Sequence, residues 1–141
     1  MFSLSDRNIL VTGAGSGIGK ATALMLGQQD AAIIVVDKNQ ETAHQTVEEL
    51  RGIRVRAAAV VADISDSDAV DQMYTDTMEN FETLDGIVHC AGIGVERTIM
   101  ETTLEEWNRI IAVNLTGTFL CAQGAAKIMA RQRYGRIVLM A

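Results

Sequence analysis

One glycine-rich stretch limits what this chain can fold into. It reads Thr-Gly-Ala-Gly-Ser-Gly-Ile-Gly over residues 12–19 and lies between two apolar runs, Ile9–Val11 and Ala31–Val36. A helix-favouring segment, Lys20–Gln29, follows the last glycine. Glycines tolerate positive φ and let the backbone approach a ligand closely. This order predicts a strand, a tight turn, a helix and a second, parallel strand.

The turn and its surroundings are typical of a dinucleotide-binding site. The helix behind the glycines begins with free N–H groups and the positive end of its dipole, which suits a pyrophosphate. Asp37 closes the second apolar run, where a carboxylate can accept hydrogen bonds from ribose hydroxyl groups. Two plainer interpretations stay open: the glycines serve only packing, and Asp37 is a helix cap or a solvated strand end.

Length and charge bound the class of protein. The chain has 141 residues and a formal net charge of -6, and we expect a single domain over residues 1–141. The negative charge argues against nucleic acid as a partner, because phosphate binding needs clustered Lys and Arg. No apolar run has the length of a membrane span, so a membrane is not an expected partner either.

Metal-ligating residue types are few and scattered. His, Cys, Asp and Glu residues do not occur with the spacing of a metal site, so no metal is expected. Cys90 and Cys121 lie in apolar surroundings and are interpreted as free buried thiols in a reducing compartment. With no signal peptide at the start of the sequence, these features predict a cytoplasmic protein.

The rest of the chain continues the alternation of apolar strands and amphipathic helices. The first strand is expected over Arg7–Val11, and later strands over Arg54–Val61, Leu84–Cys90 and Arg136–Met140. Helices are expected over Gln40–Leu50, Asp66–Phe81 and Leu104–Arg131. In the helix after the glycine-rich turn, the apolar face is assigned to Ala21, Leu24, Met25 and Leu26.

The alternation predicts an α/β fold with a Rossmann-type, doubly wound parallel sheet. Right-handed crossovers favour the strand order 3-2-1-4-5. Ligands of such sheets bind at the carboxyl ends of the strands. Four loops should meet at this edge: those carrying Gly13–Gly19, Asp37, Asp63 and Ala91-Gly92.

The pattern Thr12-Gly13-x-x-x-Gly17-Ile18-Gly19 resembles the TGxxxGxG fingerprint of the short-chain dehydrogenase/reductase family. The resemblance implies hydride transfer between a nicotinamide cofactor and an alcohol or carbonyl substrate. It also implies that the dinucleotide is bound by Gly13, Gly15, Ser16, Gly17, Ile18, Gly19, Asp37, Lys38, Asp63, Ile64, Cys90, Ala91 and Gly92. Asp63 would accept a hydrogen bond from the adenine amino group, unless it is only a loop carboxylate or a helix cap.

The choice of cofactor is predicted from the same loop. Asp37 would hold the ribose hydroxyl groups and repel a 2′-phosphate, so NAD is expected and NADP is less favoured. In the resembling family, NADP users often carry a basic residue just before the middle glycine, where this chain has Ser16. Lys20 and Lys38 weaken this preference, because either could soften the repulsion.

Two further positions match or depart from the family pattern. His89-Cys90-Ala91-Gly92 stands where the family usually has Asn-Asn-Ala-Gly. Because adjacent strand residues point to opposite faces, His89 and Cys90 are interpreted as structural and not as a nucleophile pair. Asn114, within Asn-Leu-Thr-Gly, resembles the family asparagine that bends its helix and holds a relay water through its carbonyl. Asn114 is the catalytic-type residue that the resemblance implies, unless it is merely a surface asparagine.

The family's catalytic serine and YxxxK motif have no counterpart here. Four residues after Tyr74 and Tyr134 come Met78 and Val138. Aligned on Gly135-Arg136-Ile137-Val138, the serine would follow Ala141. We therefore expect the N-terminal portion of such an enzyme, incomplete after the fifth strand and inactive alone.

Other functions stay open. The chain could be a non-catalytic NAD-binding module that associates with other subunits or partners. A nucleotide-sugar epimerase is ranked last, because its relatives use TGxxGxxG spacing. The apolar fifth strand would be an edge strand, so self-association into a homo-oligomer is expected.

Overall fold

The computed structural model describes residues 3–140. Its strands are β1 (Asn8–Thr12), β2 (Ala32–Asp37), β3 (Ala57–Val61), β4 (Gly86–His89) and β5 (Arg136–Leu139). Its helices are α1 (Gly17–Gly27), α2 (Gln40–Gly52), α3 (Ser67–Asn80), α4 (Leu104–Ile111), the π-helical stretch η1 (Ala112–Gly117) and α5 (Thr118–Gln132).

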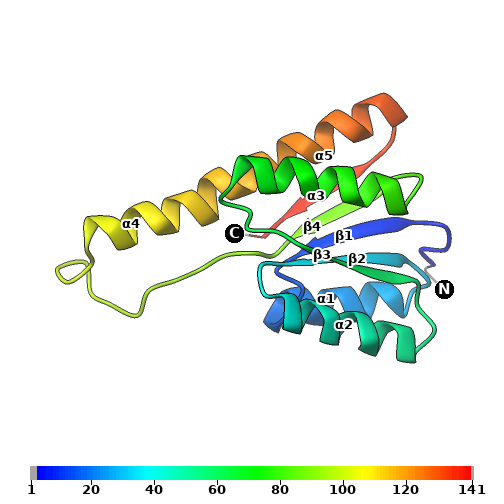
Figure 1. Ribbon diagram of the computed structural model, residues 1–141, viewed down its shortest axis with the longest axis horizontal. Helices are drawn as coiled ribbons and strands as arrows, with labels where there is room; N and C mark the ends of the chain where they lie inside the picture. The colour runs from blue at the N-terminus through cyan, green and yellow to red at the C-terminus, as the bar shows by residue number, and fades with distance from the viewer. Residues whose placement is uncertain (1–2, 141) are drawn as a thin grey trace.

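A five-stranded parallel sheet lies at the centre, in the order β3-β2-β1-β4-β5. The predicted fold class and strand order are therefore confirmed. The central strand β1 pairs on both sides: Leu10 lies opposite Ile34 of β2 and Ile87 of β4. Helices α1 and α2 pack on one face of the sheet and α3 and α5 on the other (Figure 1).

The two faces of the sheet carry separate cores. Along β2, Ile33 and Val35 point towards α1 and α2, while Ile34 and Val36 join the cluster under α3 and α5. All four side chains are fully buried. A strand covered on both faces needs an unbroken apolar run, since successive side chains alternate between faces. This explains the composition of residues 33–36.

Two details of the sequence-based assignment were wrong. The fully buried residues of α1 are Gly19, Ala23 and Gly27. Of the predicted apolar face, Leu24 and Leu26 pack against the core, whereas Ala21 is exposed and Met25 is 62% exposed. Small residues spaced four apart let α1 lie close to the sheet and to α2. The third strand begins at Ala57 rather than Arg54, because Arg54 has φ of 66° and forms a turn with the end of α2.

The long helix expected over Leu104–Arg131 is interrupted. Its start carries the capping box of Thr103 and Glu106, in which each side chain bonds the other residue's backbone N–H. The irregularity around Asn114 takes the form of η1, and α4 and α5 run on in nearly the same direction (Figure 1). A π-helical turn widens the backbone without requiring a sharp bend.

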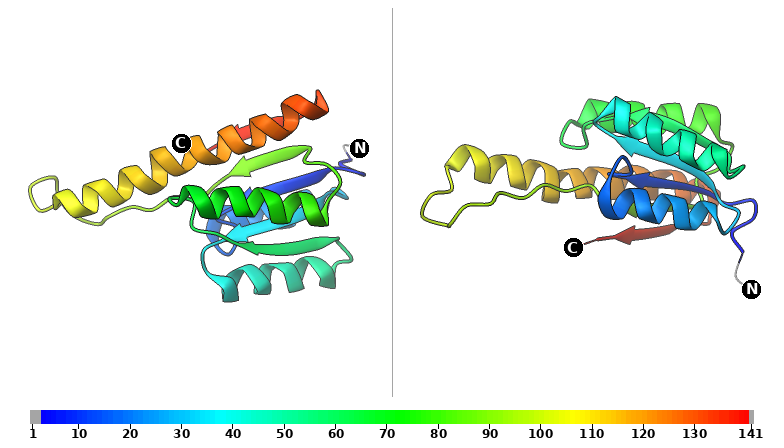
Figure 2. Two further views of the ribbon diagram at one scale, coloured as in Figure 1. Left: turned by 45° about the horizontal axis from the view of Figure 1, so that its top comes forward. Right: turned by 90° about the horizontal axis from the view of Figure 1, so that it is seen from below.

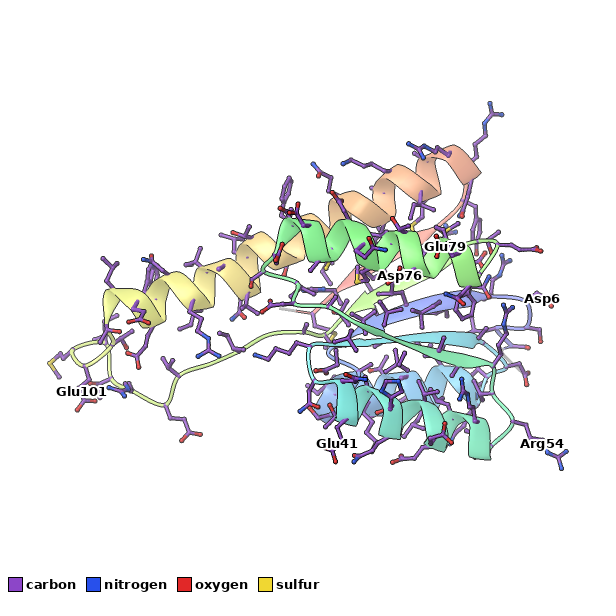
Figure 3. The ribbon with its side chains drawn as sticks, viewed as in Figure 1. Asp6, Glu41, Arg54, Asp76, Glu79 and Glu101 are labelled. Carbon is purple, nitrogen blue, oxygen red and sulfur yellow. The ribbon has the colours of Figure 1, made fainter. Side chains whose placement is uncertain are left out.

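The part of the chain around α4 projects from the body. Both views in Figure 2 show α4 and the loop before it extending beyond the sheet. The edge strand β5 is exposed along its length, with Val138 49% and Leu139 46% exposed. Glu41, Arg54 and Glu101 are exposed and point away from the body in Figure 3.

Candidate functional site

A pocket of about 350 Å³ lies at the carboxyl ends of β1, β2, β3 and β4. This volume is in the range of small-molecule sites. The predicted edge of the sheet therefore does form a hollow where the four loops meet. Its lining consists of Gly13, Ser16, Gly17, Ile18, Gly19, Val36, Asp37, Lys38, Ala62, Asp63, Ile64, Cys90, Ala91, Gly92, Ile93 and Val113.

The glycine-rich turn lies directly against the loop after β4. Gly13 has φ of 65°, and a Cβ atom there would lie 2.8 Å from the Cα of Ala91. Any side chain at this position would therefore push the two loops apart. The turn is also tied to β2, since Ala14 N–H donates to the carbonyl of Val36 at 3.0 Å.

The start of α1 faces the pocket with its backbone donors exposed. Ser16 occupies the N-cap position in an extended conformation, and its side chain makes no capping hydrogen bond. The first turn of α1 contains no acidic residue. An uncapped N-terminus with free N–H groups is suited to an anion such as a phosphate.

Asp37 is held at the mouth of the glycine-rich turn. Its Oδ2 accepts a hydrogen bond from Gly15 N–H at 2.9 Å, and its Oδ1 accepts one from Asn39 N–H at 3.0 Å. These two bonds fix the carboxylate in the pocket wall. Its plainer interpretation as a helix cap is not what the structure shows, because the side chain of Asn39 caps α2.

Asp63 follows β3 and lines the opposite side of the pocket. Its Oδ1 accepts hydrogen bonds from the hydroxyl and backbone N–H of Ser65, at 2.6 and 2.9 Å. The hydroxyl of Ser65 is the main cause that lowers the pKa of Asp63, with smaller contributions from Lys38 and Arg109. Asp63 is thus ionised at neutral pH. The cap of α3 is Asp66.

The loop after β4 is anchored through backbone groups. The hydroxyl oxygen of Thr12 accepts hydrogen bonds from the N–H groups of Cys90 and Ala91, each at 3.2 Å. Cys90 is half-buried, and burial is the main cause that raises the pKa of its thiol. A protonated thiol in this position is a packing group and not a nucleophile.

Asn114 reaches the same loop from η1. Its Oδ1 accepts a hydrogen bond from Ile93 N–H and its Nδ2 donates to the Ile93 carbonyl, both at 2.8 Å. This reciprocal pair ties η1 to the pocket, because Ile93 and Val113 both line it. Asn114 itself is not a lining residue.

Residues 7–141 of the sequence match the family described as short chain dehydrogenase. This match spans nearly the whole chain. The chain belongs to the short chain dehydrogenase family. The resemblance found in the TGxxxGxG pattern is therefore confirmed.

Individual relatives of the short chain dehydrogenase family agree with this assignment. A 3-oxoacyl-[acyl-carrier-protein] reductase from Synechocystis sp. is 38% identical over 139 residues, which cover 98% of this chain and 56% of the relative. The (2S)-[(R)-hydroxy(phenyl)methyl]succinyl-CoA dehydrogenase subunit BbsD from Thauera aromatica is 37% identical, with coverage of 98% and 56%.

A crystal structure of a short chain dehydrogenase from Mycobacterium avium superimposes with a TM-score of 0.89 at 30% sequence identity. The superposition covers 96% of this chain and 54% of that protein. The chain thus spans about half the length of the relatives it matches.

Within this short chain dehydrogenase fold, the expected cofactor residues lie together around the pocket, with one exception. Gly15 is not a lining residue; it instead supplies the N–H that holds Asp37. The sequence reasoning missed four lining residues: Val36, Ala62, Ile93 and Val113. Val36 and Ala62 stand next to assigned acids, a signal that could have found them. Ile93 directly follows the assigned Gly92, which is the same kind of signal, whereas Val113 reaches the pocket from η1.

Over residues 3–140, no group of three or more His, Cys, Asp and Glu side chains could hold a metal ion. None of the helices in this range has both the length and the apolar character that a membrane crossing requires.

Proposed function

We propose that this chain is the NAD(H)-binding portion of a short-chain oxidoreductase that transfers hydride between the nicotinamide and an alcohol or carbonyl substrate. The observation that carries the proposal is the position of Asp37. Its carboxylate lies in the pocket wall and is bonded to the glycine-rich turn at Gly15. A charged acceptor beside a phosphate-binding turn is suited to an adenosine ribose.

The residues present fit a dinucleotide. Gly13 lets the glycine-rich turn come close to the backbone of Ala91, and both residues line the pocket. The N-terminus of α1 supplies free N–H groups for the pyrophosphate. Asp63 offers an ionised acceptor on the adenine side, by family resemblance. The bound nicotinamide would supply the hydride; these residues bind and orient it.

Charge favours NAD over NADP. A 2′-phosphate would come next to the carboxylate of Asp37, and like charges at short distance repel strongly. Lys20, one of two lysines that could offset this repulsion, is engaged in an ion pair with Glu49, with 2.8 Å between Nζ and Oε1. Lys38 lines the pocket, and its charge also acts on Asp63.

The family and the names of two relatives support the proposed substrate class. One is named for reducing a 3-oxoacyl group and the other as dehydrogenase of a hydroxyl-bearing succinyl-CoA. Both names describe interconversion of an alcohol and a carbonyl. By itself this chain is expected to bind the cofactor without turnover, since Tyr74 is buried and donates its hydroxyl proton to the Cys121 carbonyl.

Calorimetric titration of the chain with NAD and with NADP tests the proposal. Asp37→Asn keeps an oxygen that can accept from Gly15 but removes the charge. We expect this variant to bind NAD about tenfold more weakly, as for the loss of one charged hydrogen bond. The difference between its affinities for NAD and for NADP should also become smaller. Asp71→Ala, which removes an exposed carboxylate of α3 outside the pocket, is the control. The proposal is contradicted if the chain binds neither nucleotide, or if Asp37→Asn binds NAD as tightly as the unaltered chain does.

A second candidate is a non-catalytic NAD-binding module that associates with other subunits, including copies of itself. The exposed apolar side chains of β5, together with Leu115 at 64% and Phe119 at 58% exposure, support association. The two free thiols, Cys90 and Cys121, support a cytoplasmic location, because such thiols persist in reducing compartments. Sedimentation of the chain over a range of concentrations tests the association.

A further inference from the structure

A buried histidine connects the pocket to the helix beyond it. His89 ends β4 and is 1% exposed. Its Nδ1 lies 2.9 Å from the hydroxyl oxygen of Thr12, and its Nε2 lies 3.0 Å from the hydroxyl oxygen of Thr118. The ring does not line the pocket. It bridges β1 and α5 through β4.

The proton on one side of the ring is determined by its neighbours. Thr118 Oγ1 lies 2.7 Å from the backbone carbonyl oxygen of Asn114. A carbonyl can only accept, so the single hydroxyl proton of Thr118 is committed to Asn114. The contact with His89 must then be a hydrogen bond from Nε2–H to the Thr118 oxygen.

The hydrogen bond at Nδ1, on the other side of the ring, follows from the one at Nε2. In a neutral imidazole with its proton on Nε2, Nδ1 is an acceptor. It receives the hydroxyl proton of Thr12, whose oxygen in turn accepts the N–H groups of Cys90 and Ala91. The hydrogen bonds therefore run one way, from the loop after β4 to the carbonyl of Asn114.

A charged ring would break this order. A second proton on Nδ1 would take away the acceptor of the Thr12 hydroxyl proton. It would also place a third donor at the Thr12 oxygen, beside the N–H groups of Ala91 and of Cys90, the latter of which also bonds the Thr12 carbonyl at 3.3 Å. Burial lowers the pKa of His89 and so also favours the neutral ring. The groups that bond the ring, the hydroxyls of Thr12 and Thr118, carry no charge to compensate a cation.

We propose that His89 is a positioning residue: as the neutral Nε2–H tautomer, it fixes η1 and the Asn114 carbonyl relative to the pocket wall. The side chain of Asn114 completes the connection between η1 and the pocket wall, because it forms hydrogen bonds with Ile93 on that wall. The hydrogen-bond chain stands independently of any nucleotide. Its effect on ligand binding rests on the function proposed above.

The first test is the tautomer of His89, read from the ¹⁵N resonances of the imidazole in the whole chain. His44→Gln assigns the signals, because the sequence contains only two histidines. We expect Nε2 protonated and Nδ1 unprotonated at neutral pH. A ring protonated on Nδ1, or on both nitrogens, overturns the proposal, whether or not the chain binds NAD.

The second test asks whether the ring holds the pocket wall. Thr118→Val removes the hydroxyl but keeps the shape, and Thr116→Val makes the same change at an exposed position of η1. We expect the Ile93 amide to exchange with solvent about tenfold faster in Thr118→Val than in Thr116→Val, since one hydrogen bond is lost from the chain. His89→Leu should act like Thr118→Val. His89→Gln, whose amide can still donate to Thr118, should restore protection.

The outcomes separate the two proposals. Equal exchange in Thr118→Val and Thr116→Val, or no rescue by His89→Gln relative to His89→Leu, removes the positioning role. If the variants do not fold, the tautomer measured on the unaltered chain still decides. Absence of NAD binding with the expected tautomer overturns the proposed function and leaves the role of His89 in place.

Discussion

The carboxylate of Asp37 accepts a hydrogen bond from the backbone N–H of Gly15, with 2.9 Å between Oδ2 and N. The acid at the end of β2 and the turn after β1 therefore form one unit. The position is also crowded: a Cβ atom at Gly15 would lie 2.8 Å from the same Oδ2. A glycine is needed here because the hydroxyl of Thr42 and the carboxylate of Asp37 leave no room for a side chain, and not because of its φ angle.

Gly15→Ala should therefore weaken NAD binding even though residue 15 does not line the pocket. The added methyl group meets both the hydroxyl of Thr42 and the carboxylate of Asp37. Displacing the carboxylate should lower the affinity for NAD about tenfold, as for the loss of one charged hydrogen bond. Calorimetry measures it. Gly52→Ala is the matched control, because a Cβ atom there has open space around it. Equal affinity of the two variants for NAD would contradict this link between Gly15 and the ligand site.

The stability of the chain should fall in mild acid because of His89. Burial lowers the pKa of His89 below its usual value of 6.5. Between the two values the unfolded chain binds more protons than the folded one, so the free energy of unfolding decreases as pH falls. The stability that the neutral His89 contributes is fully present above about pH 6.5, the pKa in the unfolded chain. It is lost as the pH falls from there towards the lower pKa in the folded chain. Urea unfolding between about pH 8 and 5 measures this.

The histidine variants separate the source of that dependence. His89→Gln should flatten the pH dependence between neutral pH and mild acid, while His44→Gln should keep the dependence that His89 causes. If the free energy of unfolding changes with pH equally in His89→Gln and in the unaltered chain, other groups cause the loss of stability.

Tyr74 should stabilise the packing of α3 on α5. Its hydroxyl donates to the carbonyl of Cys121 in the buried interface. Tyr74→Phe keeps the ring and should lower the free energy of unfolding by about 1 kcal/mol. Tyr134→Phe is the control: its ring is 39% exposed and lies below Arg7 and Arg136, contacts that phenylalanine keeps. A loss no larger for Tyr74→Phe than for this control would contradict the role of the buried hydroxyl.

Association, if it occurs through the edge of the sheet, should depend on β5. Val138→Lys places a charge on this edge and should shift sedimentation towards the monomer, since lysines on edge strands oppose pairing. Val61→Lys makes the same change on β3, the opposite edge. The two valines are equally exposed, at 49% each. If both variants dissociate the protein equally, β5 has no special part in association.

The fold could be predicted from the sequence because several local signals agreed. The buried run of β2 and the capping box at Thr103 each predicted their element correctly. The face of α1 was only partly predicted: Leu24 and Leu26 pack against the core, but hydrophobicity also favoured Met25. The close approach to the sheet instead selects Gly19, Ala23 and Gly27. Sequence patterns measure apolar character and do not measure the distance between two elements.

The site could be predicted only where residues follow directly from a strand end. Asp37, Asp63 and Ala91 lie there, and the topology brings them together. Val113 could not be found in this way, because it reaches the pocket through the π-helical geometry of η1. The sequence predicted an irregularity near Asn114 from poor helix formers, but a kink and a π-helical turn have the same local composition.

The hydroxyl of Thr12 holds the loop after β4 by two main-chain N–H groups, those of Cys90 and Ala91. Bonds of this kind are indifferent to side-chain identity. This chain can therefore carry His-Cys where its family usually carries Asn-Asn and still keep the path of the loop. A loop held through its backbone leaves the neighbouring side chains available for other contacts, and the ring of His89 makes such contacts with Thr12 and Thr118.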